Sequence, residues 1–148
     1  MLIPLQSIIT RYSIQIAGVL HVGAHFGQEY DEYINCGASE VIFIEPCENA
    51  FANLKQKFGS MPNVSLINVA LGDINGRFPM YSDTTNQDQS NSLLKPKIHL
   101  EQYPEVMFGC EPETVEVKKL SSIDFSKNVN LLVMDTQGVT ERIKTARI

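Results

Sequence analysis

Several features that would point to nucleic acid or membrane are missing from this chain of 148 residues. Its 12 Lys and Arg residues are outnumbered by 17 Asp and Glu residues, which gives a net charge of -5. A phosphate backbone requires a basic face, so this balance disfavours a nucleic-acid partner. No stretch approaches the roughly 18 apolar residues of a membrane span. The first 20 residues lack a basic start followed by an apolar core, so no signal peptide is predicted.

Cysteine and histidine are too sparse for a disulfide framework or a recognisable metal site. Cys36, Cys47 and Cys110 are scattered, and no C-x-x-C pair exists. This usage indicates reduced thiols, and we expect a cytoplasmic location. His21 falls on a predicted strand and His25 in the following turn. They therefore do not form the pair of histidines on one helix face that binds zinc in an H-E-x-x-H motif. No metal is therefore predicted.

The first 70 residues alternate between strand and helix patterns. Continuous apolar runs at 16–22, 41–44 and 64–70 predict three buried parallel strands. Helical patterns follow Gly27 and begin again near Glu48, and a short helix is expected within residues 3–14. This order predicts an α/β fold, one half of a doubly wound sheet with right-handed crossovers.

The pattern changes after residue 70. Asn75-Gly76 predicts a hairpin turn that leads into a short strand at 77–81. A polar run at 82–92 opens an irregular loop region, 82–112. Residues 114–120 alternate as a strand, and 130–134 predict a fourth buried strand. We expect one domain over residues 1–148, with a helical extension at 1–15.

Glycines and acids fall where these parallel strands end. Gly23 and Gly27 flank the turn after the first strand, Glu45 ends the second, and Asp135 ends the fourth. Parallel strands place their carboxyl ends at one edge of the sheet, where ligands of open α/β sheets bind. Glycine allows the backbone to approach a ligand closely. A glycine at such a turn can also serve the turn alone.

A ribose-containing ligand without phosphates fits these residues. Glu45 follows Gly23 by 22 positions, close to the roughly 20 residues that separate the glycine turn from a ribose-binding acid. Neither G-x-G-x-x-G nor G-x-x-x-x-G-K-[ST] is present, so no pyrophosphate cradle is predicted. The cofactor that meets both conditions is S-adenosylmethionine.

Three strings together resemble the FkbM family of S-adenosylmethionine-dependent methyltransferases. They are Val22-Gly23-Ala24-His25-Phe26-Gly27-Gln28-Glu29, Ile44-Glu45-Pro46 and Asp135-Thr136-Gln137-Gly138, and residues 86–94 share the likeness. The resemblance covers about residues 18–138. It implies a Rossmann-like class I fold, for which we expect a sheet of order 3-2-1-4. It also implies O-methylation of a sugar or small natural product. The Asn75-Gly76 signal places a β-hairpin insertion after strand three.

The resemblance also implies roles for individual residues. Gly23, Ala24 and Gly27 would line the methionine and adenosine portions, and Glu45 would hold the ribose. Ala70 and Leu71 would border the adenine, and Asp135 would face the methionine end or the acceptor. Asp135 and His25 are the candidates for a general base.

The sequence departs from the family pattern in two places. Many relatives have an acid where His21 stands, and Thr140 occupies the place of a glutamate, with Glu141 one residue later. The chain also ends where class I methyltransferases add further strands, so we expect a shortened domain. Strand four would then be an uncovered edge for self-association.

Alternatives to the methyltransferase interpretation stay open at this point. A non-catalytic cofactor-binding or interaction module is the alternative from a different class. An NAD-dependent oxidoreductase is disfavoured by the missing G-x-G-x-x-G. The loop at 82–92 is either a solvated connection or a segment that folds over the cofactor.

Overall fold

A computed structural model describes residues 4–81, 93 and 113–136 of the chain. The predictions for the loop at 82–92, for most of the irregular region to 112 and for residues 137–148 lie outside this part.

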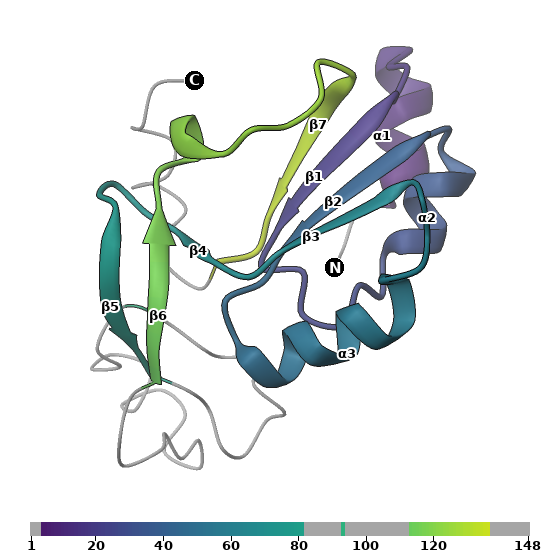
Figure 1. The fold of residues 1–148 in the computed structure, drawn as a ribbon. Helices are drawn as coiled ribbons and strands as arrows, with labels where there is room; N and C mark the ends of the chain where they lie inside the picture. The colour runs from purple at the N-terminus through teal and green to yellow at the C-terminus, as the bar shows by residue number, and fades with distance from the viewer. Residues whose placement is uncertain (1–3, 82–92, 94–112, 137–148) are drawn as a thin grey trace, which may run out of the picture.

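A four-stranded parallel sheet forms the centre of the molecule (Figure 1). Its strands are β1 (Gly18–Val22), β2 (Glu40–Ile44), β3 (Val64–Ile67) and β7 (Val129–Met134). They are arranged in the order β3-β2-β1-β7, and each neighbouring pair is parallel. The predicted α/β class and the 3-2-1-4 order are therefore confirmed, with β7 as the fourth strand.

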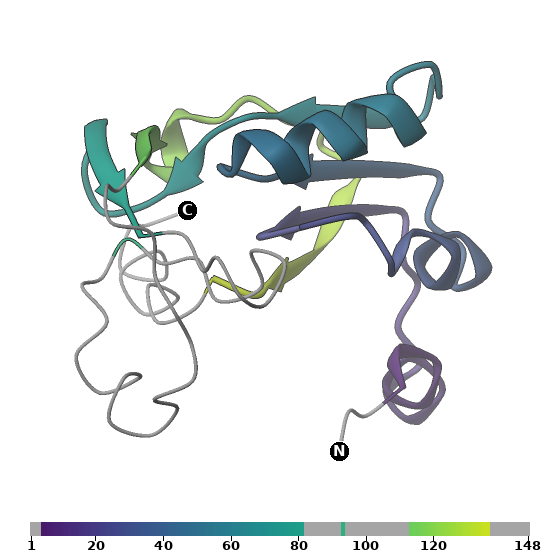
Figure 2. The same cartoon turned by 90° about the horizontal axis from the view of Figure 1, so that it is seen from below.

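The two faces of this sheet are covered differently, which explains its continuous apolar runs. Helices α2 (Tyr30–Asn35) and α3 (Glu48–Phe58) connect the first three strands, and Figures 1 and 2 both show α3 running beside β3. Their apolar side chains pack on one face of the sheet in a cluster that includes Val19, Phe43, Leu54 and Phe58. On the other face, Leu20 and Ile44 pack against the chain near Leu71 and Leu120. Both faces are thus buried, as parallel sheets require.

A second, smaller sheet lies beside the carboxyl ends of the central strands (Figure 1). It contains β4 (Ala70–Leu71), β5 (Gly76–Met80) and β6 (Glu113–Lys118) in the order β4-β6-β5, and a 3-10 turn, η1 (Leu120–Ser122), follows β6. The pairing of β6 is parallel with β4 and antiparallel with β5.

This small sheet corrects two details of the sequence interpretation. The run 64–70 is not one strand: its last residue belongs to β4, which leaves the central sheet to pair with β6. An antiparallel pair does follow strand three, but Asn75-Gly76 is not its hairpin turn, because β6 lies between β4 and β5. The Asn75 side chain instead accepts a hydrogen bond from the Lys119 backbone N–H at 2.8 Å.

The predicted N-terminal helix is present as α1 (Leu5–Tyr12). Leu5 and Ile9 pack against the helix-side core, and the Leu5 N–H donates to the Glu32 carboxylate at 2.9 Å, which joins α1 to α2. Among the described residues, no helix combines the length and the apolar character that crossing a bilayer requires.

Candidate functional site

A cavity of about 330 Å³ opens where the central strands end. Its size falls at the lower end of the roughly 300–1,000 Å³ typical of small-molecule sites. The walls come from the first turn and the ends of β2, β4 and β7: residues 21–25, Gln28, Glu29, Glu45, Pro46, 69–71, Met80, Leu93, Asp135 and Thr136. The structure therefore brings together Gly23, Ala24, His25, Glu45, Ala70, Leu71 and Asp135, all of which the sequence singled out.

The turn after β1 is fixed by close backbone contacts. The N–H groups of Gly23 and Ala24 both donate to the Ile44 carbonyl oxygen, at 2.9 and 3.2 Å. Gly23 has a φ of +77°, and a Cβ placed on it would lie 2.0 Å from the Asp135 carbonyl oxygen. Only glycine fits this position, because a side chain would collide with the chain that leaves β7. The ends of β1, β2 and β7 are thereby held together around the cavity.

Gly27 lies elsewhere. It is buried against α3, where an added Cβ would lie 2.7 Å from the Phe58 ring and 3.0 Å from the Leu54 side chain. It does not line the cavity. The structure accounts for this glycine by the packing of the turn on α3, and it shows no place for Gly27 beside a ligand.

Glu45 is the most firmly held acid of the cavity. Only 6% of the residue is exposed. One carboxylate oxygen accepts the His25 N–H at 2.8 Å, and the other accepts the Cys47 N–H at 2.9 Å. The Glu45 carboxylate therefore connects the turn after β1 to the turn after β2. These two bonds orient the carboxylate at the wall of the cavity.

An apolar wall faces one side of the cavity. Val69, Ala70 and Leu71 are buried, and Met80 from β5 is 2% exposed. Leu93 packs on the same wall and joins the core beneath β4 to the core of the small sheet. A flat heteroaromatic ring can be seated against such a surface. The place of Met80 in this wall could not be read from the sequence, because Met80 reaches it through the long-range pairing of β5 with β6.

His21 and Glu29 also line the cavity. His21 is 3% exposed, and its Nδ1 lies 3.0 Å from the Tyr33 hydroxyl oxygen. Burial lowers the pKa of His21 to about 4, although the nearby Asp135 carboxylate opposes this shift. The imidazole is therefore uncharged at neutral pH. In the sequence, Glu29 stood out only as the last residue of the first family string; the turn brings it to the cavity.

The electrostatic character of the cavity follows from these residues. Glu29, Glu45 and Asp135 line it, and no Lys or Arg does so among the residues that the structure describes. Carboxylates repel phosphate groups and accept hydrogen bonds from hydroxyl and cationic N–H groups. The cavity thus favours a cationic or polyol-bearing ligand over a pyrophosphate.

S-adenosylmethionine fits this set of residues by its chemistry. Its ribose hydroxyls match the oriented Glu45 carboxylate, its adenine matches the apolar wall, and its sulfonium cation matches the acidic lining. In the described part of the chain, no group of three or more His, Cys, Asp or Glu side chains is arranged to hold a metal ion.

Comparison with curated proteins finds a methyltransferase relative. Over 129 residues the chain is 29% identical to the 2-O-methyltransferase NoeI of Sinorhizobium fredii. The match covers 81% of this chain, which spans about half of that relative (53%).

Solved structures give a partial likeness. An S-adenosylmethionine-dependent methyltransferase from Mesorhizobium loti matches 51% of this chain and 35% of its own, with 18% identity and a TM-score of 0.36. A structure from Pyrococcus horikoshii matches 43% of this chain and 32% of its own, with 23% identity and a TM-score of 0.37. The fold assignment stands on the strand order of the chain itself.

The family comparison covers most of the chain, including every segment that lines the cavity. The model of the methyltransferase FkbM domain matches residues 21–141, from His21 on β1 to beyond Asp135. The chain therefore belongs to the FkbM methyltransferase family.

Proposed function

We propose that this protein binds S-adenosylmethionine and transfers its methyl group to a hydroxyl oxygen of a sugar or another small molecule. Membership of the FkbM family and the likeness to a relative named as a 2-O-methyltransferase support the reaction class. The observation that carries the proposal is the buried Glu45 carboxylate, which two backbone N–H groups hold at the wall of the cavity.

Different cavity residues contact three different parts of the ligand. Glu45 accepts hydrogen bonds from the two ribose hydroxyls. Ala70 and Leu71 contact the adenine ring from the apolar wall. Gly23 and Ala24, with Asp135 beyond them, border the methionine end, where the backbones of the first turn and of the β7 end meet.

The chemistry is a displacement at the methyl carbon. When bound, the cofactor supplies a methyl group whose C–S bond breaks with its electron pair going to sulfur, while a bond forms to the acceptor oxygen. Asp135, exposed at the end of β7, is the base that takes the hydroxyl proton, and His25 is the second candidate. Orientation of the acceptor by the protein contributes up to about 7–11 kcal/mol in such reactions.

Isothermal titration with S-adenosylhomocysteine tests the binding step. The Glu45→Gln variant should bind about 10- to 100-fold more weakly, because hydrogen bonds to charged groups contribute about 1.5–3 kcal/mol. The matched control is Glu40→Gln at the opposite end of the same strand, away from the cavity. The proposal is overturned if the folded wild-type protein does not bind, or if Glu45→Gln binds as the wild type does.

A turnover assay separates the enzyme from a cofactor-binding module. The measurement is the release of S-adenosylhomocysteine with a panel of mono- and oligosaccharide acceptors. Asp135→Asn should keep most of the affinity for S-adenosylhomocysteine while the rate falls about 100-fold or more, the usual range for loss of a general base. If the wild type binds the cofactor and methylates no hydroxyl acceptor, the protein is a binding module.

A further inference from the structure

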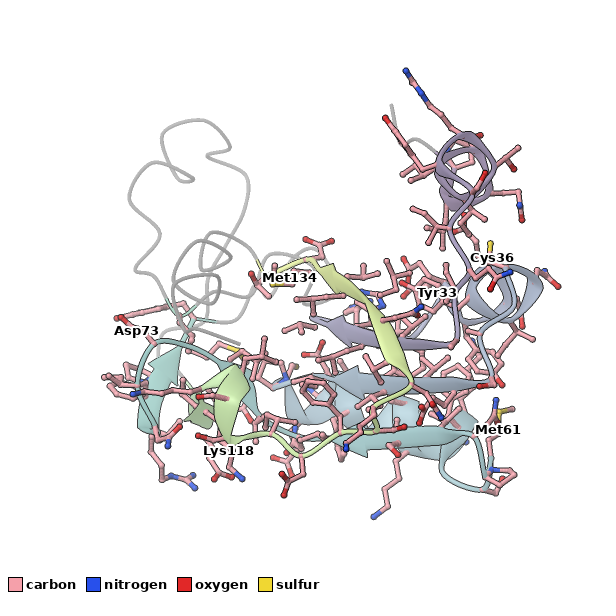
Figure 3. All side chains as sticks on the ribbon, turned by 90° about the horizontal axis from the view of Figure 1, so that it is seen from above. Tyr33, Cys36, Met61, Asp73, Lys118 and Met134 are labelled. Atoms are coloured by element: carbon pink, nitrogen blue, oxygen red, sulfur yellow. The ribbon has the colours of Figure 1, made fainter. Side chains whose placement is uncertain are left out.

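One side chain outside the cavity joins the ends of two central strands. Asn68 stands between β3 and β4, where the chain leaves the central sheet for the small one. Figure 3 shows the two ends of this path, with Met61 before β3 and Asp73 after β4 at opposite sides of the molecule. The Asn68 amide nitrogen donates to the carbonyl oxygens of Glu45 and Pro46, at 2.8 and 3.2 Å. The exit of β3 is thereby joined to the turn after β2.

These two bonds continue the pairing of β2 with β3 beyond the backbone ladder. The ladder reaches as far as the Glu45 N–H, which donates to the Ile67 carbonyl oxygen at 3.1 Å. Beyond this point Pro46 has no N–H to donate, and the residues after Asn68 turn away to pair with β6. One primary amide can serve two carbonyl oxygens, because its nitrogen carries two N–H groups. The Asn68 side chain therefore holds the two strand ends together where the backbone no longer does so.

An amide is the chemical group that this position requires. Both atoms that face the Asn68 nitrogen are carbonyl oxygens, which only accept hydrogen bonds. An aspartate of nearly the same shape has no donor when it is ionised, and its charge would lie beside two partial negative charges. The substitution Asn68→Asp therefore replaces two attractions with repulsion and leaves the size of the side chain almost unchanged.

Asn68 fixes the backbone from which the Glu45 carboxylate projects. The N–H groups of His25 and Cys47 hold that carboxylate, so Glu45 is bonded at its N–H, its carbonyl oxygen and both carboxylate oxygens. Val69, the next residue after Asn68, begins the apolar wall of the cavity. Asn68 itself does not line the cavity. It therefore connects the ribose-binding acid to the adenine wall of the proposed site from outside that site.

We propose that Asn68 is a positioning residue that sets the spacing between the ribose and the adenine contacts, and with it the preference of the site for ligands that carry both ribose hydroxyls. This inference rests on the proposed function and extends it to a residue that touches no ligand atom. Hydrogen bonds weaken steeply when donor and acceptor are misaligned, so a displaced Glu45 carboxylate would lose both hydroxyl contacts together. Apolar contact is non-directional, so the adenine contact would change little.

Two nucleosides that differ only in the ribose hydroxyls test this role by titration. Adenosine carries both hydroxyls, and 2′,3′-dideoxyadenosine carries neither. Asn68→Asp should weaken the binding of adenosine and of S-adenosylhomocysteine about 10-fold, and that of 2′,3′-dideoxyadenosine by less than about 2-fold. The matched control is Asn53→Asp. It makes the same change in an exposed asparagine whose amide also donates to a backbone carbonyl oxygen, that of Asn49 at 2.8 Å, on α3 away from the cavity.

A double-mutant cycle with Glu45→Gln shows whether Asn68 acts through the carboxylate. In the Glu45→Gln protein, Asn68→Asp should weaken S-adenosylhomocysteine binding by no more than about 3-fold, because residues that act through one another are not additive. A structural role without a link to Glu45 would leave the 10-fold loss of about the same size in both backgrounds. The cycle uses S-adenosylhomocysteine alone, so it decides the question even where a nucleoside binds too weakly to be titrated.

Each other outcome has a definite meaning. Equal weakening of the two nucleosides by Asn68→Asp, no weakening of S-adenosylhomocysteine, additive losses in the cycle, or equal losses in Asn68→Asp and Asn53→Asp each overturn the role of Asn68 and leave the proposed function standing. If circular dichroism shows that Asn68→Asp is unfolded, Asn68→Ala removes the donors without adding charge and should show the same selective loss. A folded wild type that does not bind S-adenosylhomocysteine overturns the proposed function and this inference with it.

Discussion

The substitution Gly23→Ala tests whether close contact between the first turn and the end of β7 builds the cavity. The new Cβ would lie 2.0 Å from the Asp135 carbonyl oxygen and 2.9 Å from its carbonyl carbon. Both atoms belong to backbone, which cannot rotate away as a flexible side chain would. The end of β7 must therefore shift, and the hydrogen bond from the Asp135 N–H to the Val22 carbonyl oxygen, now 2.9 Å, is lost or stretched.

The magnitude is the sum of two effects. A non-glycine residue at a φ of +77° costs about 1–2 kcal/mol. Displacement of the β7 end, with a lost hydrogen bond of about 1 kcal/mol and disturbed packing, brings the expected total to about 3–4 kcal/mol.

Gly37→Ala is the matched control, because it has the same backbone strain without the collision. Gly37 has a φ of +102°, and its added Cβ would meet only the Ile16 carbonyl oxygen, at an ordinary 3.6 Å. The strain of about 1–2 kcal/mol is partly offset by the smaller chain entropy of the unfolded state, about 0.4–1 kcal/mol. We expect a net cost of about 1 kcal/mol for this variant.

Urea unfolding followed by circular dichroism measures the difference. With an m-value of about 1–3 kcal/mol per M, a gap of about 2–3 kcal/mol separates the midpoints of the two variants by about 0.7–3 M. The Gly23→Ala protein should also bind S-adenosylhomocysteine more weakly than Gly37→Ala does. Equal midpoints for the two variants would refute the idea that this contact holds the strand ends together.

Two further predictions concern Gly27 and His21. Gly27→Ala should destabilise the fold by about 2–4 kcal/mol, because its Cβ would press on the buried ring of Phe58. The affinity of the remaining folded protein for S-adenosylhomocysteine should change less than in Gly23→Ala. A selective loss of affinity without destabilisation would place Gly27 at the ligand instead. For His21, the folded pKa of about 4 lies below the unfolded value of 6.5, so the stability linked to its neutral form is present above pH 6.5 and lost as the pH falls toward 4. Relative to His21→Asn, the wild type should therefore lose up to about 3 kcal/mol of unfolding free energy between pH 6.5 and 4; parallel pH profiles of the two proteins would contradict this.

Much of the site could be read from the sequence because parallel topology is strict. Once the runs ending at Val22, Ile44 and Met134 are recognised as neighbouring parallel strands, their carboxyl ends must meet. That rule alone gathers Gly23, Glu45 and Asp135 around one cavity.

Other residues could not be assigned from local patterns. The family resemblance assigned Gly27 to the ligand, yet it serves the packing of the turn on α3. The hairpin signal at Asn75-Gly76 was local, whereas the partner of β5 is β6, more than 30 positions further along the chain. A strong turn signal describes the turn and leaves the choice of strand partner to long-range packing.

The sequence by itself determined the alternation of strands and helices, the α/β class and the acids and glycine at the strand ends, because these follow from apolar periodicity and from residues adjacent in the chain. Only the tertiary structure decided that Met80 and Leu93 form the apolar wall and that Glu29 lines the cavity beside a neutral His21. The reason is physical: hydrogen-bond satisfaction, burial and the pKa of a side chain are set by neighbours that folding brings from distant segments.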